Sequence, residues 1–255
     1  MSALAASDFP PLRVLVVDDD EYNRLLLMRY LPSPPFTVET AANGLGATQA
    51  VARQWPDIVL IDMEMPVMNG LEAVAWMRAR EAGEGRRPGP IVMMSSNDDA
   101  VSIRRGLEAG SSRYLTKPFT REALLALLYE LANPDAVASS PAPLELQPAR
   151  PASTGPAVDP DAAVTVDPEL RSEVPAFLAS RRRLVEDMAA ALAAGDREQL
   201  RTVAHRAAGG LALFGFQWAA WQSRAISSQA VAGQGPALAG EIEALRRHLA
   251  QVRVL

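Results

Sequence analysis

Three aspartates stand where the strands of a sheet would end. Asp18 and Asp19 follow the apolar run RVLVV (13–17), and Asp62 follows DIVLI (57–61). In a parallel sheet the carboxyl ends of the strands share one edge, so these carboxylates would meet there. Two carboxylates about 4 Å apart, at an effective dielectric of about 20, repel each other by roughly 4 kcal/mol, which a fold tolerates if a cation neutralises them. An all-oxygen site with room for water suits Mg²⁺, so the sequence predicts a magnesium site.

A lysine and a hydroxyl would complete this site for phosphoryl transfer. Ser95 ends the apolar run IVMMS (91–95), and Lys117 follows RYLT (113–116). A bound Mg²⁺ and a lysine would neutralise charge on a phosphoryl group while one carboxylate attacks it. Asp62 stands alone at its strand end and is the best nucleophile, and the Ser95 hydroxyl would donate to the phosphoryl oxygens. Taken singly, an Asp-Asp pair is often a helix cap and a Lys-Pro a turn, but their order at successive strand ends favours a functional site.

The elements that would position these groups alternate along residues 12–132. Strand-like runs lie at 13–17, 36–40, 57–61, 91–95 and 113–116, and helical patterns lie at 20–31, 44–54, 70–81, 98–109 and 120–132. Three of the strand runs are almost wholly apolar, as strands buried on both faces should be. The alternation predicts an α/β domain with a doubly wound, five-stranded parallel sheet.

The remainder of the chain has a different character. Residues 133–165 contain seven prolines and few large apolar residues, so they are interpreted as a linker. Residues 167–253 are helical in pattern, with a short helix starting at Asp167-Pro168, a long helix ending at Gly195, a capped helix starting at Asp196, and two more at 216–230 and 236–251. This second domain is predicted to be an all-α antiparallel helix bundle.

The bulk composition excludes several classes of protein. The chain has 255 residues, a length typical of two domains, and a net charge of −5, which argues against a general nucleic-acid binder. It contains no cysteine, so a disulfide framework and a thiolate zinc site are excluded. The N-terminus lacks the pattern of a signal peptide, and no run of about 18 apolar residues would span a membrane. We therefore expect a cytoplasmic protein that binds neither nucleic acid nor membrane.

Four segments of the first domain together resemble a known family. VLVVDDDEYNR, DIVLIDMEMPVMNG, PIVMMSS and YLTKPF are similar to the receiver domains of two-component response regulators, in order and in spacing. The resemblance implies a flavodoxin-like fold, Mg²⁺-dependent phosphorylation of Asp62 and a metal contact from the main-chain carbonyl of Glu64. It also implies that Ser95 is the switch hydroxyl and Tyr114 the switch aromatic, which would repack a partner-binding face on phosphorylation. Glu64 and Asn97 occupy positions that influence the lifetime of the phosphate in this family.

His205 is the candidate for chemistry in the second domain. On a helical wheel the buried stripe centres on Leu200, and His205 lies about 140° away from it, so we expect its side chain to be exposed at mid-helix. The stretch LRTVAHRAAGGLALFGF resembles histidine phosphotransfer (HPt) domains, which place a glycine four residues after the histidine and another at the next turn, here Gly209 and Gly215. The resemblance implies that His205 is a second phosphoacceptor.

The second domain departs from this family at one position. The family usually has a lysine three residues after the histidine, and here that residue is Ala208. Arg206 carries a positive charge but lies on a different side of the helix. The other histidine, His248, is expected on a solvated face.

Three functions are compatible with these residues. In the first, the chain is a phosphorelay protein that a histidine kinase, a hybrid kinase or a phosphotransfer protein phosphorylates on Asp62, with His205 exchanging phosphoryl groups with other receiver domains. It would not be an enzyme beyond its own phosphoryl transfer and dephosphorylation, because no nucleotide loop or kinase domain is recognisable. A linker of this length spans about 30 Å, which would also permit transfer within one chain.

In the second function, suggested by Ala208, the chain is a phosphorylation-switched binding module whose degenerate bundle docks or sequesters a partner protein. In the third and weakest, the chain is a DNA-binding regulator. The basic run RRR (181–183) is its only support, and such a run on a helix is expected to be a solvated face.

Overall fold

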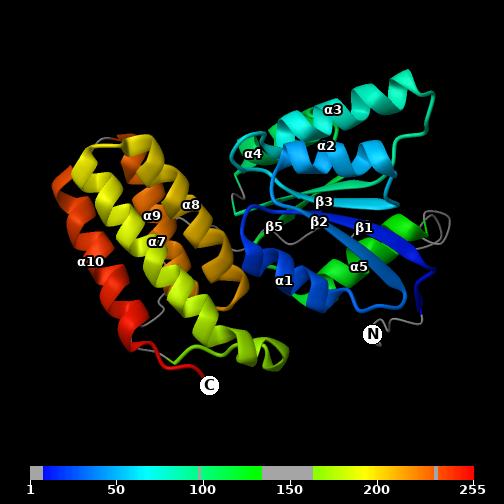
Figure 1. Cartoon of the computed structure of the whole chain (residues 1–255). Coiled ribbons are helices and arrows are strands. Elements are labelled where there is room, and N and C mark those ends of the chain that lie inside the picture. The colour runs from blue at the N-terminus through cyan, green and yellow to red at the C-terminus, as the bar shows by residue number, and fades with distance from the viewer. Residues whose placement is uncertain (1–7, 97–98, 134–162, 233–234) are drawn as a thin grey trace. The chain divides into compact units, whose positions relative to one another are not determined.

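Five parallel strands form the sheet of the first of two compact units, which divide near residue 150 (Figure 1). The computed structural model describes residues 8–96, 99–133, 163–232 and 235–255. The strands are β1 (Leu12–Val17), β2 (Phe36–Ala41), β3 (Ile58–Asp62), β4 (Ile91–Ser95) and β5 (Arg113–Thr116), in the order β2-β1-β3-β4-β5. β3 and β4 are buried along their whole length, which explains their apolar sequences. The predicted doubly wound parallel sheet is confirmed.

Five helices cover the two faces of this sheet. They are α1 (Glu21–Tyr30), α2 (Gly44–Arg53), α3 (Gly70–Gly83), α4 (Ala100–Glu108) and α5 (Arg121–Ala132). α1 and α5 lie on one face, and α2, α3 and α4 lie on the other (Figure 1). Each begins at a side chain that accepts a hydrogen bond from the first turn, which satisfies an amide that the helix cannot; for α1 this is Asp20, whose carboxylate accepts from the Tyr22 amide at 2.9 Å.

An arginine of α3 ties together the connections before β4 and β5. Arg78 donates to the Glu81 carboxylate at 2.7 Å, to the Gly89 carbonyl at 2.9 Å and to the Gly110 carbonyl at 2.8 Å. Glu81 is buried and also accepts from the Gly89 amide at 2.7 Å. A buried carboxylate needs such partners, because an unpaired charge in the interior is costly.

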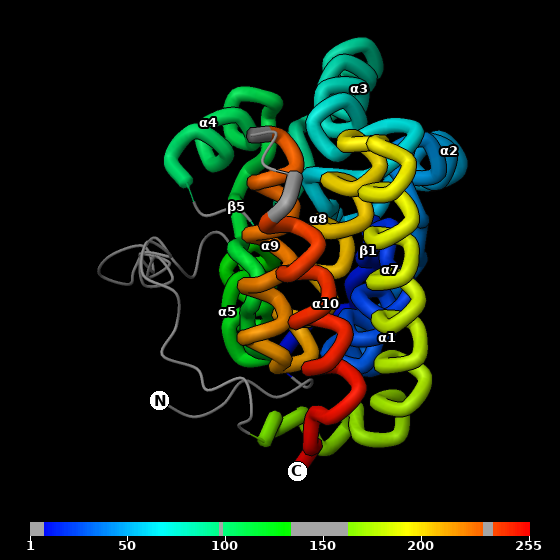
Figure 2. The backbone as a smooth tube through the Cα atoms, turned by 90° about the vertical axis from the view of Figure 1, so that its left-hand side faces the viewer, coloured from blue at the N-terminus to red at the C-terminus, as the bar shows by residue number. Residues whose placement is uncertain are grey.

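The second unit is a helix bundle that begins with a short 3₁₀ turn, η2 (Pro168–Glu173). Its helices are α7 (Val174–Ala194), α8 (Arg197–Leu213), α9 (Gln217–Ala232) and α10 (Gly235–Gln251). α7 packs against α8, α8 against α9, α9 against α10, and α10 against α7 (Figure 2). The predicted turns are confirmed at Gly195, in the left-handed conformation, and at Asp196, which caps α8 by accepting from the Gln199 amide.

The segment between the two units falls largely outside the described residues. The predicted linker runs from 133 to 165, and of these residues only 133 and 163–165 are described. Val164, which composition assigned to the linker, instead forms a parallel bridge with Val254, and its amide donates to the Arg253 carbonyl at 2.8 Å. The chain therefore joins the bundle a few residues earlier than the proline content indicates.

Two expectations of solvated side chains in the bundle are wrong. Arg181 is 2% exposed, and its guanidinium lies 4.8 Å from the centre of the Phe177 ring. His248 is 8% exposed, and its ring centre lies 4.6 Å from that of Trp218. Flat polar groups that stack on aromatic rings can be buried at low cost. Phe177 precedes Arg181 by four residues on α7, whereas Trp218 of α9 meets His248 only through the packing of α9 against α10. The basic run at 181–183 thus does not form one solvated face.

Among the described residues, no helix combines the length and apolar character needed to cross a bilayer.

Candidate functional site

The three predicted carboxylates meet at the carboxyl edge of the sheet. The pairing of β1 with β3 sets Val17 opposite Ile61, so Asp18 and Asp62 emerge side by side. Asp18, Asp19 and Asp62 offer carboxylate oxygens that all lie within 4.8 Å of one another. Asp18 and Asp62 are buried, whereas Asp19 is partly exposed and leaves one side of the cluster open to water. An all-oxygen set with open positions fits Mg²⁺, which retains several water ligands.

Lys117 completes the cluster from the end of β5. Its ammonium nitrogen lies 2.7 Å from Asp18 Oδ2 and 3.1 Å from Asp62 Oδ1, and the side chain is 1% exposed. Burial alone would lower the pKa of this ammonium, but the Asp18 and Asp62 carboxylates outweigh burial and hold it above the ordinary value for lysine. Lys117 therefore stays protonated and neutralises one charge of the cluster.

Asp62 is the carboxyl group whose protonation is most perturbed. Burial, with additional repulsion from Asp18 and Asp19, raises its pKa to about 8 in spite of the neighbouring Lys117. A carboxyl group with this pKa holds a proton at neutral pH and is then a poor nucleophile. A divalent cation would favour the ionised form, which is the form that attacks a phosphoryl group.

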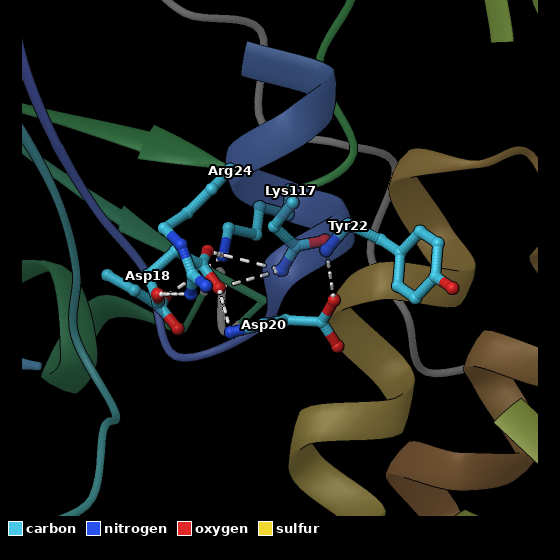
Figure 3. Close-up of polar contacts among 7 residues, drawn as sticks. Asp18, Asp20, Tyr22, Arg24 and Lys117 are labelled. Carbon is cyan, nitrogen blue, oxygen red and sulfur yellow. Dashed lines mark hydrogen bonds and ion pairs between the residues drawn. The ribbon is translucent and has the colours of Figure 1, made fainter. Parts of the chain in front are cut away.

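The orientation of Asp18 is determined by the first turn of α1. Its Oδ1 accepts from the Asp20 amide at 2.9 Å, and the Asn23 side-chain amide donates to both of its carboxylate oxygens, at 3.0 and 3.1 Å. Arg24 donates to its main-chain carbonyl at 2.6 Å, so Arg24 and Lys117 converge on the same residue (Figure 3). Asn23 and Arg24 were not predicted as site residues. The sequence feature that could have identified them is their position in the first turn of α1, which begins directly after the aspartates.

The buried amide of Asn23 is a further indication that the site accommodates a hydrated cation. Its Oδ1 atom is buried and has no hydrogen-bond donor among the described residues. A buried acceptor without a donor is costly. A water bound to the metal is the kind of donor that would remove this cost. The carboxylates therefore fit Mg²⁺ itself, and Asn23 Oδ1 fits one of the metal's water ligands.

Ser95 and Tyr114 link the site to α4. Both are buried, Ser95 at the end of β4 and Tyr114 in β5, and the Tyr114 hydroxyl donates to Met63 Sδ at 3.8 Å. Burial raises the pKa of Tyr114 to about 12, although a hydrogen bond with the Ser95 side chain acts in the opposite direction. The Tyr114 ring also lies against α4 at Gly106, where a Cβ atom would approach two ring carbons to 3.0 and 3.2 Å. Tyr114 therefore occupies the inward position in this structure.

The first residue of α3, Gly70, is a glycine whose role sequence reasoning missed. At Gly70 a Cβ atom would lie 2.1 Å from the Asp62 carbonyl oxygen, so only glycine lets α3 begin against the backbone of the phosphoacceptor candidate. Glu64 lies in the loop between β3 and α3 and is partly buried. The predicted metal contact of its carbonyl stays a prediction, and Asn97 lies outside the described residues.

His205 belongs to the second unit. The predicted buried stripe of α8 is confirmed, because Leu200, Val203, Ala204, Ala207 and Leu211 are all buried. His205 lies near the middle of the helix and is partly exposed, whereas Ala208 is buried. The structure thus brings Asp18, Asp19, Asp62, Ser95 and Lys117 together at one sheet edge and places His205 on a separate helix face.

Two family models match the chain. The model described as the response regulator receiver domain matches residues 14–129, and the one described as the Hpt domain matches residues 174–254. The response regulator MprA of Mycobacterium sp. (strain KMS) is 38% identical over 135 residues, which cover 52% of this chain and 56% of the relative. MprA of Mycobacterium leprae is 37% identical over 132 residues, which cover 51% and 56%. The chain thus spans about half the length of the curated relatives it matches.

Solved structures of receiver domains are also similar to the first unit. The chemotaxis protein CheY4 of Vibrio cholerae is 31% identical with a TM-score of 0.43, and the match covers 47% of this chain and 97% of that one. The receiver domain of the sensor histidine kinase PA1611 from Pseudomonas aeruginosa, with a magnesium ion in its active site cleft, is 30% identical with a TM-score of 0.44, covering 48% and 98%.

The two family matches coincide with the two units of the structure. The receiver model covers the sheet and the acidic cluster at its edge, and the Hpt model covers the four helices of the bundle together with His205. The chain is therefore a protein of two-component phosphorelay signalling, in which a response regulator receiver domain is followed by an Hpt domain.

Proposed function

We propose that the chain is a phosphorelay intermediate that uses Asp62 and His205 as its two phosphoacceptors. A partner histidine kinase, hybrid kinase or phosphotransfer protein would phosphorylate Asp62, and His205 would exchange phosphoryl groups with receiver domains. The observation that carries the proposal is the convergence of Asp18, Asp62 and Lys117, with a buried ammonium 2.7 and 3.1 Å from two carboxylates. This arrangement is costly for folding alone and is suited to neutralising an incoming phosphoryl group.

The residues of the site have separable roles in this transfer. An oxygen of the Asp62 carboxylate attacks phosphorus, the bond from phosphorus to the donor's imidazole nitrogen breaks, and the electron pair of that bond stays with the nitrogen. Asp18 and Asp19, with Asp62, would hold Mg²⁺, which supplies positive charge to the phosphoryl oxygens when bound. Lys117 exchanges its contact with Asp62 for one with a phosphoryl oxygen, and the Ser95 hydroxyl donates to another. Asn23 and Arg24 keep Asp18 oriented throughout.

The chain is proposed to act without catalysing the turnover of another substrate. In this proposal its own residues promote only the gain and loss of its phosphoryl groups. Ala208, which is buried and uncharged, favours a second candidate, in which the bundle is a degenerate domain that docks or sequesters a partner.

One labelling experiment separates these two functions. The full chain is incubated with acetyl phosphate and Mg²⁺, beside the variants Asp62→Asn and His205→Gln and the control Asp187→Asn, an exposed aspartate of α7. Acyl phosphates are stable in acid and labile in base, and phosphohistidine has the opposite stability. We expect a base-labile mark that Asp62→Asn abolishes, and an acid-labile mark that both variants abolish.

The outcomes assign the role of each domain. A base-labile mark alone would support the binding module and remove His205 from the pathway. An unchanged base-labile mark in Asp62→Asn would overturn the proposed function of the receiver site. Mixing Asp62→Asn chains with His205→Gln chains then distinguishes transfer between chains, which restores the acid-labile mark, from transfer confined to one chain, which does not.

A further inference from the structure

A phosphoryl group on His205 would need positive charge beside it, and the residue one turn beyond His205 does not supply it. A phosphorylated side chain carries about −1.5 to −2 charge at neutral pH. Ala208, one turn beyond His205, is buried and uncharged. Resting on the proposed function of His205, we propose that Arg201 and Arg224 form its phosphoryl-binding pocket, one arginine from α8 and one from α9.

Arg201 shares a helix face with His205. It precedes His205 by four residues within α8, and residues four apart are neighbours on a helix surface. Both side chains are partly exposed. Arg206, by contrast, is about 140° from Arg201 around the axis and belongs to a different side of the helix.

Arg224 reaches the same place from α9. The Ser227 hydroxyl donates to the Arg201 carbonyl at 3.2 Å, so α9 packs against α8 at this level. Because the two helices are antiparallel, residues that precede Ser227 on α9 lie beside residues that follow Arg201 on α8. Arg224, three residues before Ser227, is therefore level with the residues next to His205.

The flank of α9 on which Arg224 lies is the one that faces α8. At about 100° per residue, Arg224 is about 60° from Ser227. The opposite flank of α9 faces α10, since Gln229 donates to Glu241 at 2.6 Å and Trp218 packs on His248. Around the axis of α9, Arg224 is about 120° from Trp218 and about 140° from Gln229, so it lies away from the flank that faces α10.

Two guanidinium groups on either side of an imidazole suit a phosphoryl group. Each offers a planar fork of donors that matches two phosphoryl oxygens, and such charge-assisted contacts are about twice as strong as neutral ones. The imidazole nitrogen of His205 attacks phosphorus, the bond from phosphorus to the donor breaks, and the donor leaves with that electron pair. The arginines stabilise the negative charge on the oxygens during this step and in the phosphohistidine.

The test uses a small donor, so that docking of a receiver domain has no influence. The full chain carrying Asp62→Asn is treated with phosphoramidate, whose P–N bond breaks to release ammonia as the bond from His205 to phosphorus forms. Arg201→Gln, Arg224→Gln and Arg224→Lys are compared with Arg206→Gln, which removes the same charge next to His205, and Arg183→Gln, an exposed arginine of α7. Circular dichroism and thermal unfolding confirm that each variant folds.

We expect Arg201→Gln and Arg224→Gln to slow phosphorylation of His205 by about tenfold or more, and Arg224→Lys to recover most of the rate. Arg206→Gln and Arg183→Gln should change the rate less than about twofold. In ³¹P NMR titrations, the second pKa of the phosphohistidine phosphoryl group should rise in Arg224→Gln, because a nearby cation favours the dianion. A change in folding alone would not move this pKa.

Three results would overturn the inference, each for a different reason. Equal rates and equal ³¹P titrations in all variants would show that the arginines do not contact the phosphoryl group. Normal reaction with phosphoramidate but slow transfer from a phosphorylated receiver would assign the arginines to docking instead. No phosphorylation of His205 in any chain would overturn the proposed function of the bundle, and the inference with it.

Discussion

The protonation of Asp62 leads to a quantitative prediction about Mg²⁺ binding. With a pKa of about 8, about nine in ten Asp62 carboxyl groups carry a proton at pH 7, and about one in ten at pH 9. A carboxylate must be ionised to bind a metal. We therefore expect Mg²⁺ binding to release about 0.9 proton per chain at pH 7 and about 0.1 at pH 9. The affinity should rise almost tenfold from pH 6 to pH 7 and level off above pH 8.

Isothermal titration calorimetry measures this release directly. Mg²⁺ is titrated at each pH into protein in two buffers with different enthalpies of ionisation, and the difference in heat gives the number of protons released. Asp62→Asn should remove the release, and Asp187→Asn should leave it unchanged. The explanation of the raised pKa is refuted if the unmodified chain releases no proton at pH 7, or if Asp62→Asn releases as many.

The same pKa determines how the stability of the metal-free receiver depends on pH. Between about pH 4 and pH 8 the folded state holds a proton on Asp62 that the unfolded state has lost, so the free energy of unfolding falls as pH rises. The stabilisation is complete below about pH 4 and is lost as pH passes 8. About four pH units at about 1.4 kcal/mol each set an upper limit near 6 kcal/mol. In calorimetry, saturating Mg²⁺ or Asp62→Asn should flatten this slope.

Three substitutions test other parts of the receiver. Gly106→Ala should displace the Tyr114 ring and lower the pKa of its hydroxyl from about 12 toward 10. Ultraviolet titration measures this pKa, with Tyr114→Phe as the control. An unchanged pKa would show that α4 moves away from the ring instead. Gly70→Ala should slow phosphorylation of Asp62 by acetyl phosphate and lower the free energy of unfolding by about 2–4 kcal/mol, because its Cβ would clash with the Asp62 carbonyl oxygen. A normal rate of phosphorylation would contradict the close approach of Gly70 to Asp62. Arg78→Met should lower the free energy of unfolding in urea by about 3 kcal/mol, because it leaves the buried Glu81 carboxylate without its cation. A loss under about 1 kcal/mol would argue against a stabilising role of the Arg78–Glu81 pair.

Much of the receiver site could be predicted because it depends on short-range pattern. Strands buried on both faces must be apolar, so β3 and β4 are visible as runs of large apolar residues. Parallel strands share a carboxyl edge, so the residues that follow them meet whatever the details of packing. The convergence of Asp18, Asp62 and Lys117 follows from these two rules alone, and the 3.6-residue period likewise predicts the buried stripe of α8.

Contacts between elements distant in the sequence were decided only by the tertiary structure. His248 of α10 is buried against the ring of Trp218 of α9, and a helical wheel of α10 alone contains no such neighbour. The Phe177 ring beside Arg181, by contrast, lies four residues earlier on the same helix, so that contact was within reach of sequence reasoning. Arg224 approaches the level of His205 only through the pairing of α8 with α9. Sequence periodicity determines which face of a helix is buried. Which residues of a neighbouring element contact that face depends on the register between the two elements, and long-range packing sets this register.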